Sequence, residues 1–184
     1  KMGRRPSKLN RFYEDDIPDT EENKKHQLMT LLAILKNVPV CQVYVPDCEG
    51  DDIVAYLCKG PLRDKHRVIV SADKDMYQLL DSDKVLITDL FKDEIVDDVA
   101  YEAKTGFPPT KIQFFHALIG DASDNIPGVR GIGEKSAELL VKNFDSLDHL
   151  YQNIHLVDKS RIKNALLVDE ANARLSLQLF ALAN

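Results

Sequence analysis

No apolar run in this sequence approaches the roughly 20 residues that a membrane-spanning helix requires. We also recognise no signal-peptide pattern. Cysteine is scarce, since the chain has only Cys41, Cys48 and Cys58, and no two of them have C-x-x-C spacing. An odd number of cysteines without that spacing indicates reduced thiols. These absences together predict a cytoplasmic protein.

The histidines also lack the pattern of a metal site. The chain has five of them, scattered without the spacing that zinc ligands show: His26, His66, His116, His149 and His155. Internal repeats and low-complexity tracts are absent as well. We therefore do not expect a zinc protein or a repeat architecture.

What is present is an ordinary globular composition with an acidic balance. The chain has 184 residues, 44% of them hydrophobic, which is enough for one sizeable core with a small appended subdomain. Its formal net charge of −6 is unusual for a protein that binds nucleic acid. Seven carboxylates that lie in three clusters contribute −7, so the other residues sum to −6 + 7 = +1. Because the local field matters more than the total, DNA is not excluded as a partner.

Hydrophobic spacing predicts alternating helices and strands up to residue 106, and this alternation is typical of an α/β fold with a largely parallel sheet. Residues 1–19 are basic, then acidic, with little periodicity, so we expect a flexible segment there. A helix should begin after Thr20 as its N-cap and stop before Pro39. The other predicted elements are strands at 40–45, 67–71 and 85–88 and short helices at 53–57 and 76–80.

Helical patterns dominate after Gly106. They cover residues 112–119, 135–143, 146–153 and 159–182, the last with a break. We therefore divide the chain into an α/β portion, residues 1–106, and a helical portion, residues 107–184.

Three clusters of acids stand beside these predicted elements: Glu49-Gly50-Asp51-Asp52, Asp73-Lys74-Asp75 and Asp121-Ala122-Ser123-Asp124. Any single cluster is also explained as a helix cap, because acids are favoured in the first turn of a helix. Three clusters together are harder to explain as helix caps. The first two can meet at the edge of the sheet formed by the carboxyl ends of its strands, which is where ligands bind in open parallel sheets. Carboxylates that converge there repel one another unless a cation is bound. Oxygen ligands suit Mg²⁺, so we predict a site for two divalent ions. One ion would make hydroxide from water, and the other would stabilise a leaving oxygen.

A glycine-rich turn, Gly128-Val129-Arg130-Gly131-Ile132-Gly133, follows the third cluster and leads into a helix. Its glycines permit a tight turn whose N–H groups can bind a phosphate, and Ile132 is expected to anchor it. Lys135 adds a positive charge in the first turn of the helix. No Lys-Ser/Thr follows as in a P-loop. The pattern favours contacts to duplex phosphates, which position DNA without reading its sequence, and a plain helix cap is the alternative.

Three motifs in this order resemble the 5′-nuclease family, which includes the 5′→3′ exonuclease domain of bacterial DNA polymerase I, phage 5′-exonucleases and flap endonucleases. The motifs are residues 49–55, 71–80 and 120–133, and the likeness covers nearly the whole chain. It implies a PIN-like α/β fold with a mostly parallel sheet and a helical half. That half would contain a helix–three-turn–helix element, similar to a helix-hairpin-helix, that binds duplex DNA. The host would be a bacterium or a phage-infected cell.

The resemblance also implies site residues. The ligands of two Mg²⁺ or Mn²⁺ ions would be Glu49, Asp51, Asp52, Asp73, Asp75, Asp121 and Asp124. DNA would contact Gly128, Arg130, Gly131, Gly133 and Lys135. A K⁺ ion at the hairpin would be held by the backbone carbonyls of Leu118, Ile119, Pro127, Val129 and Ile132.

The opening Lys1-Met2-Gly3-Arg4 resembles the family's stretch at the base of a helical arch, in which Lys and Arg contact the scissile phosphate. Lys1 and Arg4 are therefore catalytic candidates, and a solvated basic segment is the alternative. Family members also have an initial strand with an Asp ligand and a later Asp, and both would precede Lys1. We expect that another polypeptide supplies this N-terminal portion, or that the chain is incomplete and inactive alone.

Two functions fit these expectations. The first is a structure-selective 5′-nuclease of DNA replication and repair, or its C-terminal portion, which hydrolyses phosphodiesters by a two-metal mechanism as an exonuclease or flap endonuclease. The alternative is a non-catalytic module that binds duplex DNA and has an incomplete metal site.

Overall fold

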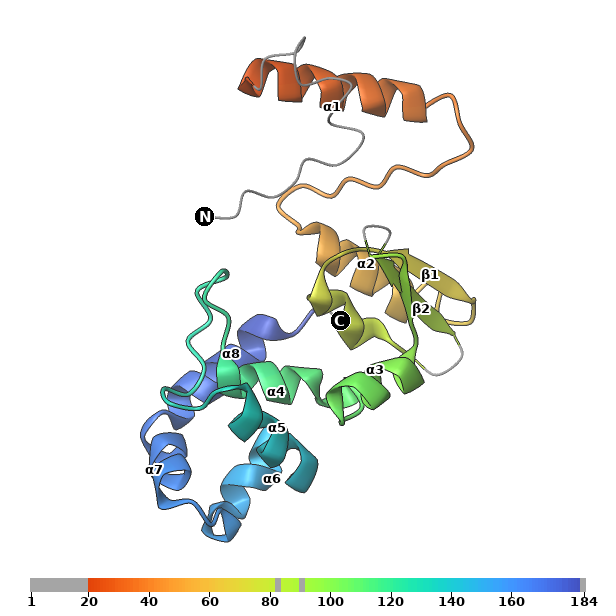
Figure 1. Cartoon of the computed structure of the whole chain (residues 1–184). Helices are drawn as coiled ribbons and strands as arrows, with labels where there is room; N and C mark the ends of the chain where they lie inside the picture. Colours follow the sequence, from red (N-terminus) through yellow and green to blue (C-terminus); the bar gives the residue numbers. More distant parts are fainter. Residues whose placement is uncertain (1–19, 82–83, 90–91, 183–184) are drawn as a thin grey trace. The chain divides into compact units, whose positions relative to one another are not determined.

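A computed structural model describes residues 20–81, 84–89 and 92–182 (Figure 1). The chain forms two compact units, Lys1–Pro46 and Asp47–Asn184. The predictions for residues 1–19, including the catalytic candidates Lys1 and Arg4, lie outside the described residues. Among the helices that are described, none is both long and apolar enough to cross a membrane.

The described part of the first unit begins with one helix, α1, which spans Glu21–Leu35. It starts as predicted, because the Thr20 side-chain oxygen accepts a hydrogen bond from the Asn23 N–H at 3.2 Å and so caps the first turn. No residue of α1 is buried, and Leu28 and Ile34 are 55% and 57% exposed. Within the described residues, α1 therefore buries no apolar face.

The strand predicted at residues 40–45 is wrong. The structure forms no strand there, and Val40, Val43 and Val45 are all exposed. A strand needs a neighbour for its N–H and C=O groups, and none of the segments that the structure describes pairs with this one. Alternating valines set the side-chain pattern of a strand but do not supply its partner.

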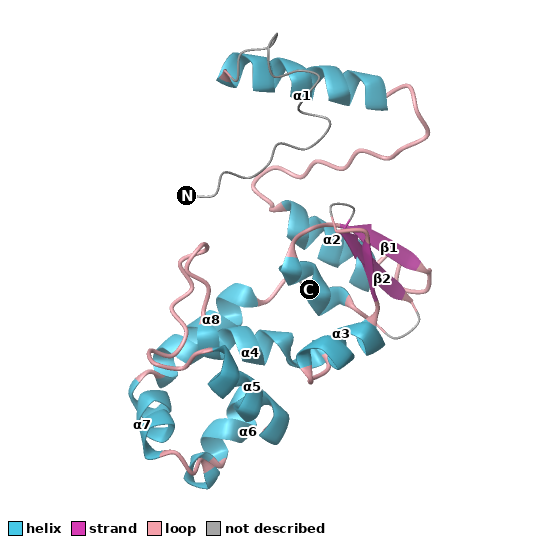
Figure 2. Ribbon diagram, viewed as in Figure 1, coloured by secondary structure: helices cyan, strands magenta, loops and turns pink. Residues whose placement is uncertain are grey.

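The second unit contains a three-stranded sheet (Figure 2). Its strands are β1 (Arg67–Val70), β2 (Val85–Asp89) and β3 (Glu94–Val96), in the order β1-β2-β3. β1 and β2 are parallel, as predicted, with Val68 opposite Leu86. β3 pairs antiparallel to β2 and was not predicted, because three residues are too few to show a period.

β1 is buried on one face and exposed on the other. Arg67 and Ile69 are buried, whereas Val68 and Val70 are 63% and 60% exposed. Successive side chains of a strand point to opposite faces. In the described part of the second unit, only one face of β1 is covered.

The predicted helices lie close to their expected positions. Those near the sheet are α2 (Gly50–Lys59), the 3₁₀ helix η2 (Lys74–Leu79) and α3 (Asp98–Thr105). Those of the helical half are η3 (Pro109–Lys111), α4 (Ile112–Ile119), α5 (Glu134–Asn143), α6 (Leu147–Gln152), η4 (Ile154–Leu156), α7 (Ser160–Val168) and α8 (Glu170–Phe180). The predicted break in residues 159–182 falls at Asp169, between α7 and α8. Helix α3 and the short 3₁₀ helices η3 and η4 were not predicted.

One hydrophobic core runs through the whole second unit. It joins Ala55 of α2 and Ile87 of β2 to Leu118 of α4 and Phe180 of α8. Helix α4 packs along α8 near the middle of the unit, and its Leu118 has no exposed surface. The sheet and the helical half therefore share their buried surface.

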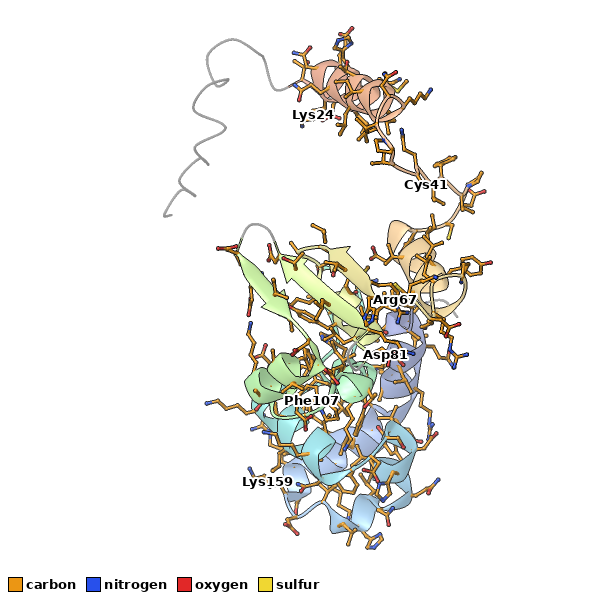
Figure 3. All side chains as sticks on the ribbon, turned by 90° about the vertical axis from the view of Figure 1, so that its right-hand side faces the viewer. Lys24, Cys41, Arg67, Asp81, Phe107 and Lys159 are labelled. Carbon is orange, nitrogen blue, oxygen red and sulfur yellow. The ribbon has the colours of Figure 1, made fainter. Side chains whose placement is uncertain are left out.

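A row of aromatic rings crosses the predicted boundary at residue 106. Phe107, labelled in Figure 3, contacts Tyr101 of α3 and Phe115 of α4, with ring centroids 5.9 Å and 5.2 Å away. The next ring, His116, stacks on Phe180 of α8 at 4.1 Å. Such pairs add stability beyond simple burial. The rings therefore connect the α/β part to the last helix.

Candidate metal centre and DNA-binding hairpin

The first two acid clusters stand at helix starts. Glu49 is the N-cap residue of α2, and Asp51 and Asp52 lie in its first turn. Asp73 follows β1 and caps η2, where its carboxylate accepts a hydrogen bond from the Asp75 N–H at 2.9 Å. Asp73 therefore has the capping role that was the alternative explanation for a single cluster.

The third cluster occupies a closed loop after α4. Gly120 ends the helix with φ 71°, and a Cβ there would lie 2.5 Å from the Ile126 carbonyl oxygen, so only glycine fits. Asp121 and Ile126 then exchange two backbone hydrogen bonds, of 2.9 and 2.7 Å. The Asp121 carboxylate accepts from the Ser123 N–H at 2.7 Å and from its hydroxyl at 2.5 Å. These bonds fix the direction of the Asp121 side chain.

The three clusters meet at one cavity of about 400 Å³. Six of the seven predicted ligands line it: Glu49, Asp51, Asp52, Asp73, Asp75 and Asp124. Its other walls are Ile126 and the end of α8 with the residues that follow, Leu179 to Leu182. The seventh acid, Asp121, is not part of the lining but is close enough for its charge to act on Asp75.

The carboxylates disturb one another's ionisation. Burial, followed by the charges of Asp73, Asp124, Asp121 and Asp51, raises the pKa of Asp75 to about 6. Burial and the same kind of repulsion also raise the pKa of Asp51. The two hydrogen bonds from Ser123 lower the pKa of Asp121. The raised pKa values of Asp51 and Asp75 show that a positive charge bound in the cavity would stabilise their ionised forms.

In the part of the chain that the structure describes, the cavity nevertheless lacks the ligand geometry of a metal site. Over the described ranges, no three His, Cys, Asp or Glu side chains come close enough together to hold an ion. The acids line the walls instead of converging on one point. Their chemistry, with oxygen donors alone, fits a hard divalent cation, but the side chains must turn inward to bind one.

The hairpin is built on two glycines in the left-handed region, Gly128 with φ 61° and Gly131 with φ 87°. Val129 and Ile132 are buried, so Ile132 anchors the turn as predicted. Gly133 is the N-cap residue of α5 and, having no side chain, leaves the first N–H groups of that helix without a side-chain cap.

The residues predicted to bind DNA differ in exposure. Arg130, Gly131, Gly133 and Lys135 are exposed, whereas Gly128 is buried. A Cβ on Gly128 would lie 2.5 Å from the Gly120 nitrogen, so this glycine serves the close packing of the turn against the end of α4. Gly128 is therefore positioned for structure, and the other four face outward.

Two buried polar side chains hold the hairpin, and the sequence reasoning missed both. The Ser176 hydroxyl of α8, with no exposed surface, accepts a hydrogen bond from the Gly128 N–H at 2.9 Å. The Asp169 carboxylate, 8% exposed, accepts from the Arg130 N–H at 2.9 Å. Their only trace in the sequence is a polar residue at a buried position, within α8 for Ser176 and at the junction of α7 and α8 for Asp169. That trace does not say which distant N–H the residue bonds.

Two of the predicted potassium-binding carbonyls already accept hydrogen bonds. The Leu118 carbonyl accepts from the Val129 N–H at 2.8 Å, and the Val129 carbonyl accepts from the Ile132 N–H at 3.1 Å. A carbonyl oxygen has two lone pairs, so each keeps one for a cation.

The second unit combines a cavity lined by carboxylates, a small sheet with helices, and a glycine hairpin in a helical half. Comparison with family models identifies the family that these features belong to. The model described as "5′-3′ exonuclease, N-terminal resolvase-like domain" matches residues 5–106, more than half of the chain. The model described as "5′-3′ exonuclease, C-terminal SAM fold" matches residues 107–184. The chain belongs to the 5′–3′ exonuclease family.

Among its relatives, a thermostable DNA polymerase I from Thermus thermophilus is 35% identical over 168 residues, which is 91% of this chain and 20% of the polymerase. A 5′-3′ exonuclease from Buchnera aphidicola is 34% identical over 155 residues, which is 83% of this chain and 51% of the exonuclease. The chain thus spans about half of that exonuclease and about a fifth of the polymerase.

Solved structures support the fold. A bacteriophage T5 5′-exonuclease with bound zinc has a TM-score of 0.74 and 23% identity, covering 94% of this chain and 65% of its own. A T5 flap endonuclease in a pseudo-enzyme-product complex with DNA and metal ions has a TM-score of 0.74 and 22% identity, covering 95% and 66%. With the family match, these likenesses confirm the predicted fold class, a resolvase-like α/β part with a helical half.

Proposed function

We propose that this chain carries the acid site and duplex grip of a structure-selective 5′-nuclease, which hydrolyses DNA at a 5′ end or a flap junction. The observation that carries the proposal is the meeting of six carboxylates, from three separate segments, at one cavity. Family membership supports it, because relatives named 5′-3′ exonuclease and DNA polymerase I match most of the chain.

The cations of this site would be Mg²⁺ or Mn²⁺, two per chain, since hard oxygen donors prefer such ions. Their ligands would be the seven predicted acids, Glu49, Asp51, Asp52, Asp73, Asp75, Asp121 and Asp124. When bound, two such ions supply a hydroxide nucleophile and stabilise the charge on the leaving oxygen. The chain's own part is to hold these carboxylates near one another and to orient them. The η2 cap does this for Asp73, and Ser123 does it for Asp121.

The partner of the hairpin would be duplex DNA. The uncapped N–H groups at the start of α5 and the exposed charges of Arg130 and Lys135 suit one backbone phosphate. The proposed K⁺ ion, held by the carbonyls of Leu118, Ile119, Pro127, Val129 and Ile132, would lie between the hairpin and that phosphate. Such contacts hold the duplex while the acid cavity faces the strand to be cut.

Ser176 and Asp169 would act as positioning residues for the DNA-binding hairpin. A peptide group is planar and trans, so its C=O points opposite to its N–H. The Gly128 and Arg130 N–H groups point to Ser176 and Asp169. The carbonyls of Pro127 and Val129 therefore point away from these two side chains, which presents them to a cation.

The catalytic roles of Lys1 and Arg4 stay predictions, as does the contribution of a second polypeptide to the site. Two fixed cations near the scissile phosphate would stabilise its developing charge. A specific observation also favours the second function, a duplex-binding module without catalysis. In the described part of the chain, no three acids are placed to bind an ion without rearrangement.

Cleavage and binding, measured separately, distinguish the two functions. We expect the chain to cut a 5′-flap duplex in Mg²⁺ when a polypeptide that supplies the N-terminal portion is present. We expect Asp73→Asn and Asp121→Asn each to abolish this cutting while DNA affinity stays within about threefold. A matched control is Asp158→Asn, which removes an exposed carboxylate outside the cavity. Binding by the wild type without any cation-dependent cutting, even with that polypeptide present, would establish the non-catalytic function instead. Full turnover by either cavity variant would refute the metal assignment.

A further inference from the structure

A second cavity, of about 360 Å³, lies at the other end of β1 from the acid cluster. β1 begins at Arg67, whereas Asp73 follows its carboxyl end. Among the described residues, the linings of the two cavities have no member in common. The polar members of the second lining are Lys59, Arg63, Arg67, Gln78 and Asp81.

Arg67 is the central group of this cavity. Its side chain is 8% exposed, and Nη1 donates a hydrogen bond to the Cys58 carbonyl at 2.5 Å, which fixes the guanidinium plane. Nε and Nη2 are buried, and neither has a hydrogen-bond partner within the described residues. A buried donor without an acceptor costs free energy, so this edge of the guanidinium lacks a partner that would stabilise it.

The one acid of the lining does not meet this need. The Asp81 carboxylate forms an ion pair with Nη2 at 3.6 Å, which is beyond hydrogen-bond distance, and its side chain is 61% exposed. Arg67 and Asp81 are both labelled in Figure 3. Lys59, Arg63 and Arg67 contribute +3 and Asp81 contributes −1, so the lining carries 3 − 1 = +2. The cavity therefore has a net positive charge and one exposed acid in its lining.

We propose that this cavity binds a phosphate group. The Nε and Nη2 edge of an arginine is the fork that donates two parallel hydrogen bonds to two oxygens of one phosphate. To reach these buried nitrogens, the phosphate takes the place of the Asp81 carboxylate, which swings into solvent. Arg63 and Lys59 supply the remaining charge. The Gln78 amide also lines the wall, and because its Nε2 already donates to the Phe180 carbonyl at 2.9 Å, only its second N–H is left for a phosphate oxygen.

The measurement is the thermal unfolding midpoint of the purified chain in inorganic phosphate against chloride at matched ionic strength, followed by direct titration. A ligand that binds only the folded state raises the midpoint. Arg67→Lys, which keeps the charge but loses the fork, should weaken phosphate binding roughly ten- to hundredfold. Arg63→Gln, at an exposed position that does not endanger folding, should weaken it roughly threefold.

Asp81→Asn distinguishes a phosphate-binding site from an Arg67–Asp81 ion pair that only stabilises the fold. Because it removes the competing carboxylate, it should tighten phosphate binding about two- to fivefold. The matched control Lys159→Gln removes one exposed positive charge outside this cavity and should change nothing. An equal response to phosphate in the wild type, Arg63→Gln and Asp81→Asn would overturn the proposal.

Competition identifies the source of the phosphate. If a deoxynucleoside monophosphate weakens duplex binding by the wild type but not by Arg63→Gln, the group belongs to a nucleic-acid backbone. If the monophosphate binds without affecting the duplex, the site takes a small phosphate compound. Because the assay needs neither a divalent cation nor cleavage, its failure leaves the proposed nuclease site untouched.

Discussion

Asp75 is an acid that folding makes harder to ionise. Its pKa rises from an ordinary 3.8 to about 6, first through burial and then through the charges of Asp73, Asp124, Asp121 and Asp51. Since the folded-state pKa lies above the unfolded value, Asp75 stabilises the fold when protonated. That stabilisation is complete below the unfolded pKa and is lost as pH rises through about 6.

We therefore predict that Asp75→Asn gains stability relative to the wild type as pH rises from about 4 to about 7 without divalent cations, because the amide carries no charge. Urea unfolding with a chelator present measures this difference. Asp64→Asn, at an exposed position, is the control and should run parallel to the wild type. A constant difference between Asp75→Asn and the wild type would show that Asp75 does not titrate in this range.

Lys135 allows a test of the hairpin at the same scale. A lysine that neutralises one phosphate releases about one counterion, so Lys135→Ala should weaken duplex binding equally for all sequences and reduce the salt slope by about one. The readout is the duplex affinity over a range of salt concentrations. Lys142→Ala, an exposed lysine at the other end of α5, is the control. An unchanged slope in Lys135→Ala would argue against a phosphate contact there.

Among the elements, α8 contacts the hairpin through Ser176, whose hydroxyl accepts a hydrogen bond from the Gly128 N–H. Ser176→Ala leaves the buried Gly128 N–H without an acceptor, which should cost about 1–3 kcal/mol of unfolding free energy. Duplex binding should lose its dependence on K⁺, because the Pro127 carbonyl is no longer oriented. Measuring duplex affinity in K⁺ and in Na⁺ separates this effect from simple destabilisation. Ser160→Ala, exposed at the start of α7, should behave as the wild type, and retained K⁺ dependence in Ser176→Ala would exclude the positioning role.

The elements also show what a sequence can and cannot predict. The α-helices of residues 107–184 were predicted nearly to the residue, because each buries an apolar stripe at helical spacing. The three-residue helices η3 and η4 are too short to show such a stripe and were not predicted. β3 was missed for its shortness, and the strand at residues 40–45 was wrong because apolar alternation does not reveal whether a partner strand exists. The acids were located by their clustering. The anchors Ser176 and Asp169 were not, since a hydrogen bond across 39 or 48 residues leaves no local pattern.

At the scale of the whole molecule, the second unit has one core that spans the predicted boundary at residue 106. Leu118 has no exposed surface and belongs to the core that also contains residues of the sheet and of the last helix. Leu118→Ala should therefore cost about 2–5 kcal/mol through the cavity it creates. It should lower the stability of the α/β and helical parts together, as a single shifted transition.

Denaturant unfolding, followed by circular dichroism and by hydrogen exchange at β2 and α5, measures whether the α/β and helical parts unfold in one transition. The control is Leu167→Ala, because Leu167 is 51% exposed and its loss should change stability little. Two separate transitions, with only the helical one shifted in Leu118→Ala, would mean that the two parts fold independently.

The central claim is that three separate acid segments form one cation site, and a calorimetric titration of Mn²⁺ into the metal-free chain tests it most directly. We predict saturable binding by the wild type at neutral pH, weakened at least about tenfold in the double variant Asp73→Asn, Asp124→Asn, which removes ligands from two of the three segments. The double variant Asp64→Asn, Asp158→Asn makes the same charge change outside the cavity and should bind as the wild type. Equal Mn²⁺ binding by the wild type and the cavity variant would contradict the account.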